Sequence, residues 1–211
     1  AMPECGIGLV PDVGGSMILA NAPGASGAYL GLSGARMGAS DAIYAGFADT
    51  YIPEIKWDEL ISELENGADL SLLARAADTP PTATLAKHQA DIDAAFTAKT
   101  LPELCARLDA QKTEFAAKAL KALGRNSPLA MAATLLMMAE LKGCGDIREA
   151  LALEYRFTAR AMEHGDFLEG IRAAIIDKDR SPRWKHSAAD FDQAEAEAML
   201  APLGPLELTF S

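Results

Sequence analysis

The sequence predicts a soluble, helix-rich globular protein. Half of its 211 residues are hydrophobic and alanine is abundant, a composition typical of helical globular chains. The length suggests one domain, or a domain with an appendage, and it is sufficient to bury a substantial core. Helix start and stop signals recur from residue 57 onward, whereas the first fifteen residues are rich in glycine.

The composition also limits the partners and the compartment. A net charge of −11 opposes general binding to nucleic acid or to an anionic membrane, because phosphate contacts need a basic surface. No run of about 18 uncharged apolar residues is present to span a bilayer, and the first residues do not resemble a signal peptide. Cys5, Cys105 and Cys144 are odd in number and far apart, which indicates free thiols in a reducing compartment such as the cytoplasm or the mitochondrial matrix. No metal site is predicted.

The candidate site is the stretch at residues 2–15, Met-Pro-Glu-Cys-Gly-Ile-Gly-Leu-Val-Pro-Asp-Val-Gly-Gly. Glu4 and Asp12 stand on either side of a seven-residue connection whose glycines allow the main chain to approach a ligand closely. The run that follows predicts a short helix, and its free N–H groups would favour the carboxylate of Asp12 nearby. The alternative is that Asp12 is an ordinary helix N-cap and Glu4 a solvated loop residue.

Short elements are predicted between residues 16 and 53. Ser40 is a plausible N-cap for a helix from Asp41 to Ala45, and Gly46 is a plausible end for that helix. A short strand is expected at residues 48–52.

Residues 57–125 are predicted to form consecutive helices. The expected ranges are 57–65, 70–77, 85–98, 101–110 and 114–123. Three signals mark the breaks between these helices. Two adjacent prolines cannot continue a helix, the residues from Thr100 to Glu103 form a capping box, and Gly124 is suited to end the last helix.

Three further helices are expected beyond residue 126. The first spans residues 128–142. The second begins at the capping box of Asp146 and runs to His164, and the third spans residues 191–200. The methionine-rich face of the first is interpreted as core packing or an oligomer contact, because methionine fills irregular gaps.

The glycine-rich stretch resembles the enoyl-CoA hydratase/isomerase (crotonase) superfamily, and within it the 3-hydroxyisobutyryl-CoA hydrolase branch. The superfamily pattern is present here as Pro3-Glu4, Gly8, Pro11 and Gly14-Gly15. The hydrolase branch has Asp directly after the second proline, where ordinary hydratases usually have Gly, so Asp12 discriminates between them. Residues 32–49 resemble a further superfamily stretch whose role is mainly structural.

The residues Glu154-Tyr155-Arg156 begin a second resemblance to the hydrolase branch, which continues through residues 166–185. Residues 166–185 read Asp-Phe-Leu-Glu-Gly-Ile-Arg-Ala-Ala-Ile-Ile-Asp-Lys-Asp-Arg-Ser-Pro-Arg-Trp-Lys. Within this run Lys178, Arg180, Arg183 and Lys185 form a local basic patch. The resemblance implies that the patch lies near the nucleotide end of coenzyme A, where Lys178 and Arg180 would contact its phosphates. The alternative is a solvated charge run around Asp177.

The resemblance implies an α/β crotonase-like fold, a ββα spiral, of which this chain holds mostly the helical C-terminal part. The resemblance also implies a division of the chain into three regions: part of the spiral core at residues 1–56, a helical insertion at residues 57–125 and a C-terminal helical region at residues 126–211. The upstream half of such a fold supplies both N–H groups of the oxyanion hole, and no corresponding glycine-rich loop precedes Glu4. We therefore expect either a fragment of a longer protein or one chain of a two-chain assembly.

The implied activity is hydrolysis of an acyl-CoA thioester, in particular 3-hydroxyisobutyryl-CoA in valine catabolism. Glu4 would attack the carbonyl or activate water, and Asp12 would orient the 3-hydroxyl group or assist proton transfer. No metal or redox cofactor is required, and a homo-oligomer is possible. Two alternatives stay open: enoyl-CoA hydration or isomerisation, and a non-catalytic helical assembly module.

Overall fold

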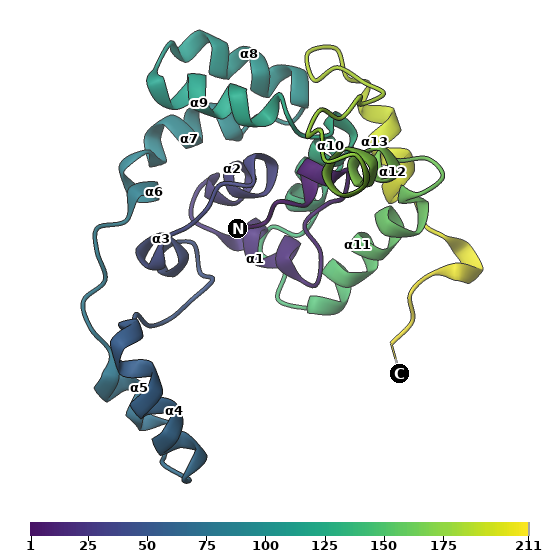
Figure 1. Cartoon of the computed structure of the whole chain (residues 1–211). Coiled ribbons are helices and arrows are strands. Elements are labelled where there is room, and N and C mark those ends of the chain that lie inside the picture. Colours follow the sequence, from purple (N-terminus) through teal and green to yellow (C-terminus); the bar gives the residue numbers. More distant parts are fainter. Residues whose placement is uncertain (211) are drawn as a thin grey trace. The chain divides into compact units, whose positions relative to one another are not determined.

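The structure is a computed structural model that describes residues 1–210. Ser211, the end of the predicted region 126–211, lies outside the described residues. The chain divides into two compact units, of which one joins residues 1–36 to the chain from His88 onward and the other spans Met37–Lys87 (Figure 1). Among the described residues, no helix has the length and hydropathy that crossing a bilayer requires.

The larger unit begins with three short N-terminal helices and continues with the helices beyond His88. Its helices are η1 (Glu4–Ile7, 3-10), α1 (Gly15–Asn21), α2 (Ser26–Ser33), α7 (Gln89–Phe96), α8 (Leu101–Gln111), α9 (Glu114–Leu123), α10 (Pro128–Glu140), α11 (Ile147–Ala161), α12 (Phe167–Ile171), η3 (Arg172–Ile176, π), α13 (Gln193–Leu200) and η4 (Gly204–Leu206, 3-10).

Helix α10 is the centre of this unit and contacts α1, α2, α11 and α13 (Figure 1). Its side chains are buried nearly all round, and Met131 and Met137 have no solvent-exposed surface. This burial confirms that the methionine-rich face serves packing. Thr100, a predicted capping residue, accepts a hydrogen bond at the start of α8, and Ser127 does the same at the start of α10.

The smaller unit is formed by helices and irregular segments. It contains α3 (Ala39–Tyr44), η2 (Glu54–Lys56, 3-10), α4 (Trp57–Glu65), α5 (Ser71–Ala76) and α6 (Thr84–Lys87). The carboxylate of Asp41 accepts a 2.8 Å hydrogen bond from the N–H of Leu85, which joins α3 to α6. The three-region division of the chain concerns its organisation within a longer fold, and it stays a prediction.

The predicted strand at residues 48–52 is wrong. No strand occurs among residues 1–210, so this segment has no neighbour with which to form a ladder. Its carbonyl groups bond outside any ladder instead: the Tyr51 C=O accepts from the Asp78 N–H at 2.9 Å, and the Ile52 C=O accepts from the Trp57 indole at 3.0 Å.

Several predicted helix boundaries also need correction. Gly38, and not Ser40, is the N-cap of α3, and the Ser40 hydroxyl donates to the Pro81 C=O instead. The predicted helix 85–98 is interrupted at His88 into α6 and α7. The helix that opens at Asp146 ends at Ala161, three residues before the predicted end.

A close backbone contact joins α12 to the N-terminal loop. A Cβ atom on Gly170 would lie 2.1 Å from the Ile7 carbonyl oxygen, and one on Gly8 would lie 2.6 Å from the Asp166 carbonyl carbon. Gly8 also has a φ of +79°, which favours glycine. Residues about 160 positions apart in the chain therefore meet main chain to main chain.

We expect Gly170→Ala to lower the free energy of unfolding by roughly 1–3 kcal/mol, because the obstructing atoms belong to the backbone and cannot rotate away. Gly145→Ala is the matched control, since a Cβ at Gly145 meets nothing within 4 Å. Denaturant titrations of both variants measure the effect. Equal stability of the two variants would contradict the close packing of α12 on η1.

Candidate active site

Cys5 anchors the loop that carries Glu4. Its side chain is fully buried against α10, with its Sγ 3.6 Å from the Thr134 hydroxyl, and its C=O accepts a 2.9 Å hydrogen bond from the Ser127 N–H. Burial raises the pKa of the Cys5 thiol to about 12, so this group is a neutral packing residue and not a nucleophile. The backbone next to Glu4 is thereby fixed to the core helix.

Glu4 is the first residue of η1 and is partly buried. Its Oε2 atom is shielded from solvent and has no hydrogen-bond partner among the described residues. Burial raises the pKa of Glu4, and the negative charge of Asp12 raises it further, whereas a backbone hydrogen bond lowers it. A carboxylate oxygen without a protein partner, with a raised pKa, is suited to accept a proton or to attack an electrophile.

Asp12 lies on a tight turn that leads into α1. The Gly15 N–H donates to the Asp12 C=O at 2.8 Å, and the two central residues, Val13 and Gly14, have φ values of +52° and +80°. Consecutive positive φ values of this kind define a type I′ turn. The negative charge of Asp12 acts on Glu4, so the two predicted carboxylates lie within electrostatic range of each other.

The short helix expected after Asp12 is α1, with Gly14 as its N-cap, but the expectation that the Asp12 carboxylate meets the free N–H groups there is wrong. The carboxylate that meets the free N–H groups belongs to Glu154 of α11. It accepts from the Gly14 N–H at 3.0 Å, from the Ser16 N–H at 3.3 Å and from the Ser16 hydroxyl. Glu154 is 3% exposed, and this burial raises its pKa while the hydrogen bonds lower it.

Sequence reasoning included Glu154 in a stretch that resembles the family but assigned it no role, although the sequence contains a signal for one. The buried positions of α11 follow the 3.6-residue period of one helix face: Ala150, Leu153, Glu154, Phe157 and Ala161. A glutamate on an otherwise apolar stripe is rarely buried without partners. The sequence could therefore indicate a buried acceptor, but not which N–H groups donate to it.

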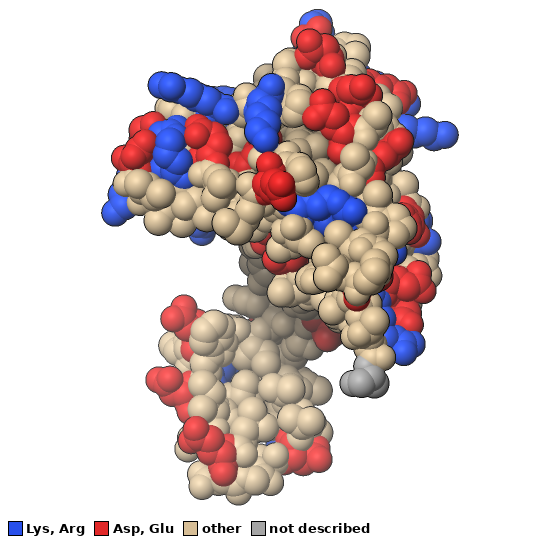
Figure 2. Space-filling model, turned by 90° about the vertical axis from the view of Figure 1, so that its right-hand side faces the viewer, with Lys and Arg blue, Asp and Glu red and all other residues tan. Residues whose placement is uncertain are grey.

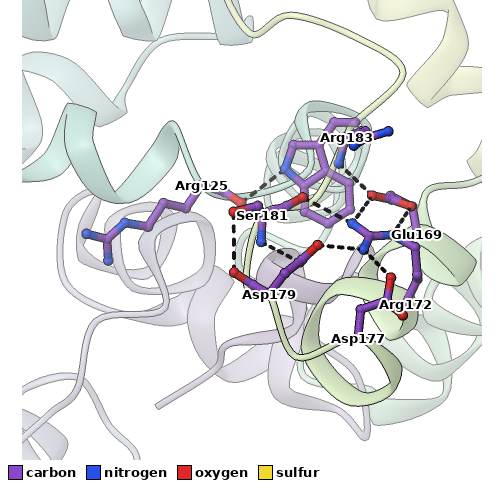
Figure 3. Close-up of polar contacts among 8 residues, drawn as sticks. Arg125, Glu169, Arg172, Asp177, Asp179, Ser181 and Arg183 are labelled. Atoms are coloured by element: carbon purple, nitrogen blue, oxygen red, sulfur yellow. Dashed lines mark hydrogen bonds and ion pairs between the residues drawn. The ribbon is translucent and has the colours of Figure 1, made fainter.

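Residues 166–185 form a cluster of charges centred on Arg172. Its guanidinium donates to Glu169 at 2.8 and 2.9 Å, and to both Asp177 and Asp179 at 2.7 Å. Figure 3 shows Arg172 between Glu169 on one side and the two aspartates on the other. The hydrogen bonds from Arg172 lower the pKa of Glu169 to about 2. This arrangement, which we call the Arg172 cluster, folds the run back on itself.

The two predicted phosphate ligands lie in the same run, at positions of unusual backbone conformation. Lys178 and Arg180 have φ values of +56° and +53°, and both side chains are exposed. Neither forms an ion pair within residues 1–210. Arg172, and not Lys178 or Arg180, pairs with Asp177 and Asp179, so the phosphate-binding patch and the solvated charge run both stay open as interpretations.

Arg180 lines a pocket of about 260 Å³, and Lys178 does not. The pocket is lined by Gly6, Arg125, Asn126, Gly170, Ala173, Ala174, Arg180 and Pro182. Gly6 is two residues from Glu4, so the pocket adjoins the N-terminal loop. Arg125 is a second basic residue there that sequence reasoning missed, and in Figure 3 its guanidinium points away from the Arg172 cluster.

Two other features delimit the site. An apolar cavity of about 660 Å³ between α1, α2, α7 and α10 is lined by neither Glu4 nor Asp12. The described part of the chain contains no group of three or more His, Cys, Asp or Glu side chains arranged to hold a metal ion.

Comparisons with known proteins relate the whole chain to one family. A family model described as enoyl-CoA hydratase/isomerase matches residues 1–200. The mitochondrial 3-hydroxyisobutyryl-CoA hydrolases of Gallus gallus and Homo sapiens are 34% and 32% identical over 99% and 100% of the chain. The chain spans 57% of the length of each of these curated relatives.

Solved structures give the same fold. The crystal structure of an enoyl-CoA hydratase from Rhodobacter sphaeroides is 57% identical with a TM-score of 0.92. That of a carnitinyl-CoA dehydratase from Mycobacterium thermoresistibile is 36% identical with a TM-score of 0.91. Each match covers all of this chain and 61% of the other, so the crotonase-like fold is confirmed for the part of that fold present here.

Proposed function

Because the chain belongs to the enoyl-CoA hydratase/isomerase family, we propose that it is the C-terminal catalytic part of an acyl-CoA thioester hydrolase acting on 3-hydroxyisobutyryl-CoA. The products are coenzyme A and 3-hydroxyisobutyrate, as in valine catabolism. The observation that carries the proposal is the pairing of Glu4, with its unpartnered Oε2, and Asp12 on the adjacent turn. The hydrolase names of the curated relatives support it.

Glu4 supplies the reactive carboxylate in this proposal. As a general base it takes a proton from water while the water oxygen bonds to the thioester carbon, and it returns the proton to the sulfur as the C–S bond breaks. As a nucleophile it bonds to that carbon itself and expels the thiolate, and water then hydrolyses the resulting anhydride. Both routes need the same unpartnered oxygen, so both stay open.

The carbonyl oxygen must be stabilised as negative charge develops on it. We propose that an upstream segment of the same protein, or a second chain, supplies the N–H groups of the oxyanion hole. We refer to the chain together with that segment as the whole protein. A metal ion or redox cofactor has no part in the proposed mechanism.

Asp12 recognises the 3-hydroxyl group of the substrate in this proposal, or assists proton transfer. Its carboxylate is partly exposed and forms no hydrogen bond within residues 1–210 that would occupy it. The turn at Val13 and Gly14 follows Asp12 directly, and the charge of Asp12 reaches Glu4. An acceptor that is free in the protein is available to a hydroxyl donor of the ligand.

The main alternative is enoyl-CoA hydration, the activity for which the 57%-identical protein from Rhodobacter sphaeroides is named. The test is to assay the whole protein with 3-hydroxyisobutyryl-CoA and with a 2-enoyl-CoA. We expect free thiol from the first, and little loss of the enoyl absorbance from the second. The reverse result would establish a hydratase, and inertness toward both would favour the non-catalytic assembly module.

The activity should depend on pH through Glu4. Only the carboxylate can act, and burial together with the charge of Asp12 raises its pKa above 4.5. As the pH falls through this raised pKa, kcat/KM should therefore decline at a higher pH than an ordinary glutamate would give. Asp12→Asn removes the nearby negative charge, so it should move this acid limb to lower pH. A pH profile with no such movement would contradict the coupling of the two groups.

We propose that Lys178 and Arg180 bind the phosphates of coenzyme A. Replacing both by Ala should raise KM for the thioester several-fold and leave kcat nearly unchanged, because uniform binding is lost. Steady-state kinetics at low salt measure this. Lys121→Ala with Lys87→Ala is a matched control that removes two exposed charges elsewhere. An unchanged KM would assign the patch to structure.

The charge of the protein and the names of its relatives bear on other partners and on its location. In the upper part of the view in Figure 2, acidic side chains are interspersed among the basic ones, so an extended phosphate backbone would meet acidic groups beside the basic ones. We propose that neither nucleic acid nor a membrane is a partner. Homo-oligomerisation, and location in the cytoplasm or the mitochondrial matrix, remain proposals; the names of the curated relatives favour the matrix.

A further inference from the structure

The proposed chemistry leaves the buried carboxylate of Glu154 unused. Glu154 is 3% exposed, and its two carboxylate oxygens are directed to Gly14 and Ser16 at the start of α1. Glu154 itself comes from α11, 138 residues later in the chain than Ser16. A buried carboxylate is costly unless its hydrogen bonds are made, and here three donors serve it.

The segment that Glu154 holds is strained. Val13 has a φ of +52°, a conformation that β-branched residues rarely adopt. The Val13 side chain is 80% exposed, so packing of that side chain does not compensate for the strain. A residue in such a conformation persists only where surrounding contacts determine it.

Two contacts from α11 restrain the turn at the next residue. Glu154 accepts from the Gly14 N–H at 3.0 Å, and the Ile147 side chain lies 2.8 Å from where a Cβ on Gly14 would be. Main-chain hydrogen bonds restrain it as well: the Gly15 N–H donates to the Asp12 C=O at 2.8 Å, and the Gly14 C=O accepts from the N–H groups of Met17 at 3.2 Å and Ile18 at 3.4 Å. Asp12 therefore directly precedes the strained residue Val13, and Glu154 binds the residue that directly follows Val13.

We propose that Glu154 is a positioning residue: it holds the strained turn at Val13 and Gly14 in the conformation that directs Asp12 at the 3-hydroxyl group of the substrate. The inference rests on the proposed function and deepens it, because it places the selectivity for 3-hydroxyacyl thioesters partly on a residue that does not touch the substrate. An ordinary helix cap would stabilise the fold and leave this selectivity unchanged.

Glu154→Gln is the first variant. The amide keeps the size of the side chain but turns one acceptor into a donor, which then faces the N–H groups of Gly14 or Ser16. The readout is the preference of the whole protein for 3-hydroxyisobutyryl-CoA over isobutyryl-CoA, both in kcat/KM and in binding affinity by calorimetry. A preference of roughly ten- to a hundredfold in the parent protein should fall to within about threefold of unity.

A double-mutant cycle separates positioning from general destabilisation. If Glu154 acts through Asp12, the preference of Glu154→Gln with Asp12→Asn should equal that of Asp12→Asn alone. A merely structural role predicts that Glu154→Gln slows both thioesters equally and leaves the preference intact. That result would overturn the inference.

A third variant covers the case in which Glu154→Gln folds poorly. Asn adopts positive φ more readily than Val, so Val13→Asn relieves the strain that Glu154 opposes. Added to Glu154→Gln, it should restore at least half of the lost preference, on a logarithmic scale. Thermal stability that recovers without any recovery of the preference would also overturn the inference.

Failure of the proposed function gives a different result. In that case the parent protein releases no thiol from either thioester, and the assignment as a hydrolase is wrong. The binding preference still tests Glu154, because a Glu154→Gln protein that keeps the parent's preference contradicts positioning whether or not hydrolysis occurs.

Discussion

Replacing Glu4 by glutamine in the whole protein is expected to lower kcat for coenzyme A release from 3-hydroxyisobutyryl-CoA by roughly 10²–10⁴-fold, while the thioester still binds. Glutamine has the size of glutamate and keeps one acceptor oxygen. It can neither attack the thioester carbon nor take a proton from water. Thiol release under saturating substrate and calorimetric titration of the thioester measure the two quantities separately.

The structure explains why this loss should fall on kcat. The Oε2 atom of Glu4 makes no hydrogen bond within residues 1–210, so the amide breaks no existing side-chain contact of that atom. The neighbouring Cys5 remains held by Ser127 and Thr134, which should keep the loop in place. The fold, and with it the binding of the thioester, should therefore survive the substitution.

Glu163→Gln is the control for the same chemical change at a distance from the site. Its side chain is 84% exposed, and its only ion pair in the described chain, at 3.8 Å, is with His164. It should leave kcat within about twofold, since surface substitutions rarely matter. If Glu4→Gln turned over as fast as this control, Glu4 would not be the reactive carboxylate.

The sequence allowed prediction of those parts of the molecule that depend on neighbouring residues. The helices at 57–65 and 114–123 have the predicted bounds, because their caps and apolar periods are local signals. The strand at residues 48–52 failed because a strand depends on a partner, which no local pattern reports.

In the candidate site, too, the sequence allowed prediction of the residues that are neighbours in the chain but not of those that meet through folding. The two carboxylates lie within one short stretch, so a motif could identify Glu4 and Asp12 together. Glu154 meets that stretch only through the packing of α11 on α1, and its sequence gives no sign of which N–H groups it accepts from. The run at residues 166–185 is folded around Arg172, and the sequence of the run does not indicate this role of Arg172.

Asp12→Asn is the second substitution with a large expected effect, and here the effect should depend on the substrate. If Asp12 accepts a hydrogen bond from the 3-hydroxyl group, loss of that partner costs about 1–3 kcal/mol. The preference for 3-hydroxyisobutyryl-CoA over isobutyryl-CoA, roughly ten- to a hundredfold, should then shrink toward unity. Steady-state kinetics with the two thioesters provide the measurement.

The structure removes the competing explanation in which Asp12 serves as a helix cap. The N-cap of α1 is Gly14, and the free N–H groups there are satisfied by Glu154. The free energy of unfolding should therefore change by no more than about 0.5 kcal/mol in Asp12→Asn, as expected for a surface substitution. Asp190→Asn, at an exposed position elsewhere, is the matched control for both measurements. An Asp12→Asn protein that is stable and slows both thioesters equally would place Asp12 in the chemical step, because a residue that recognises the hydroxyl group must act on one substrate and not on the other.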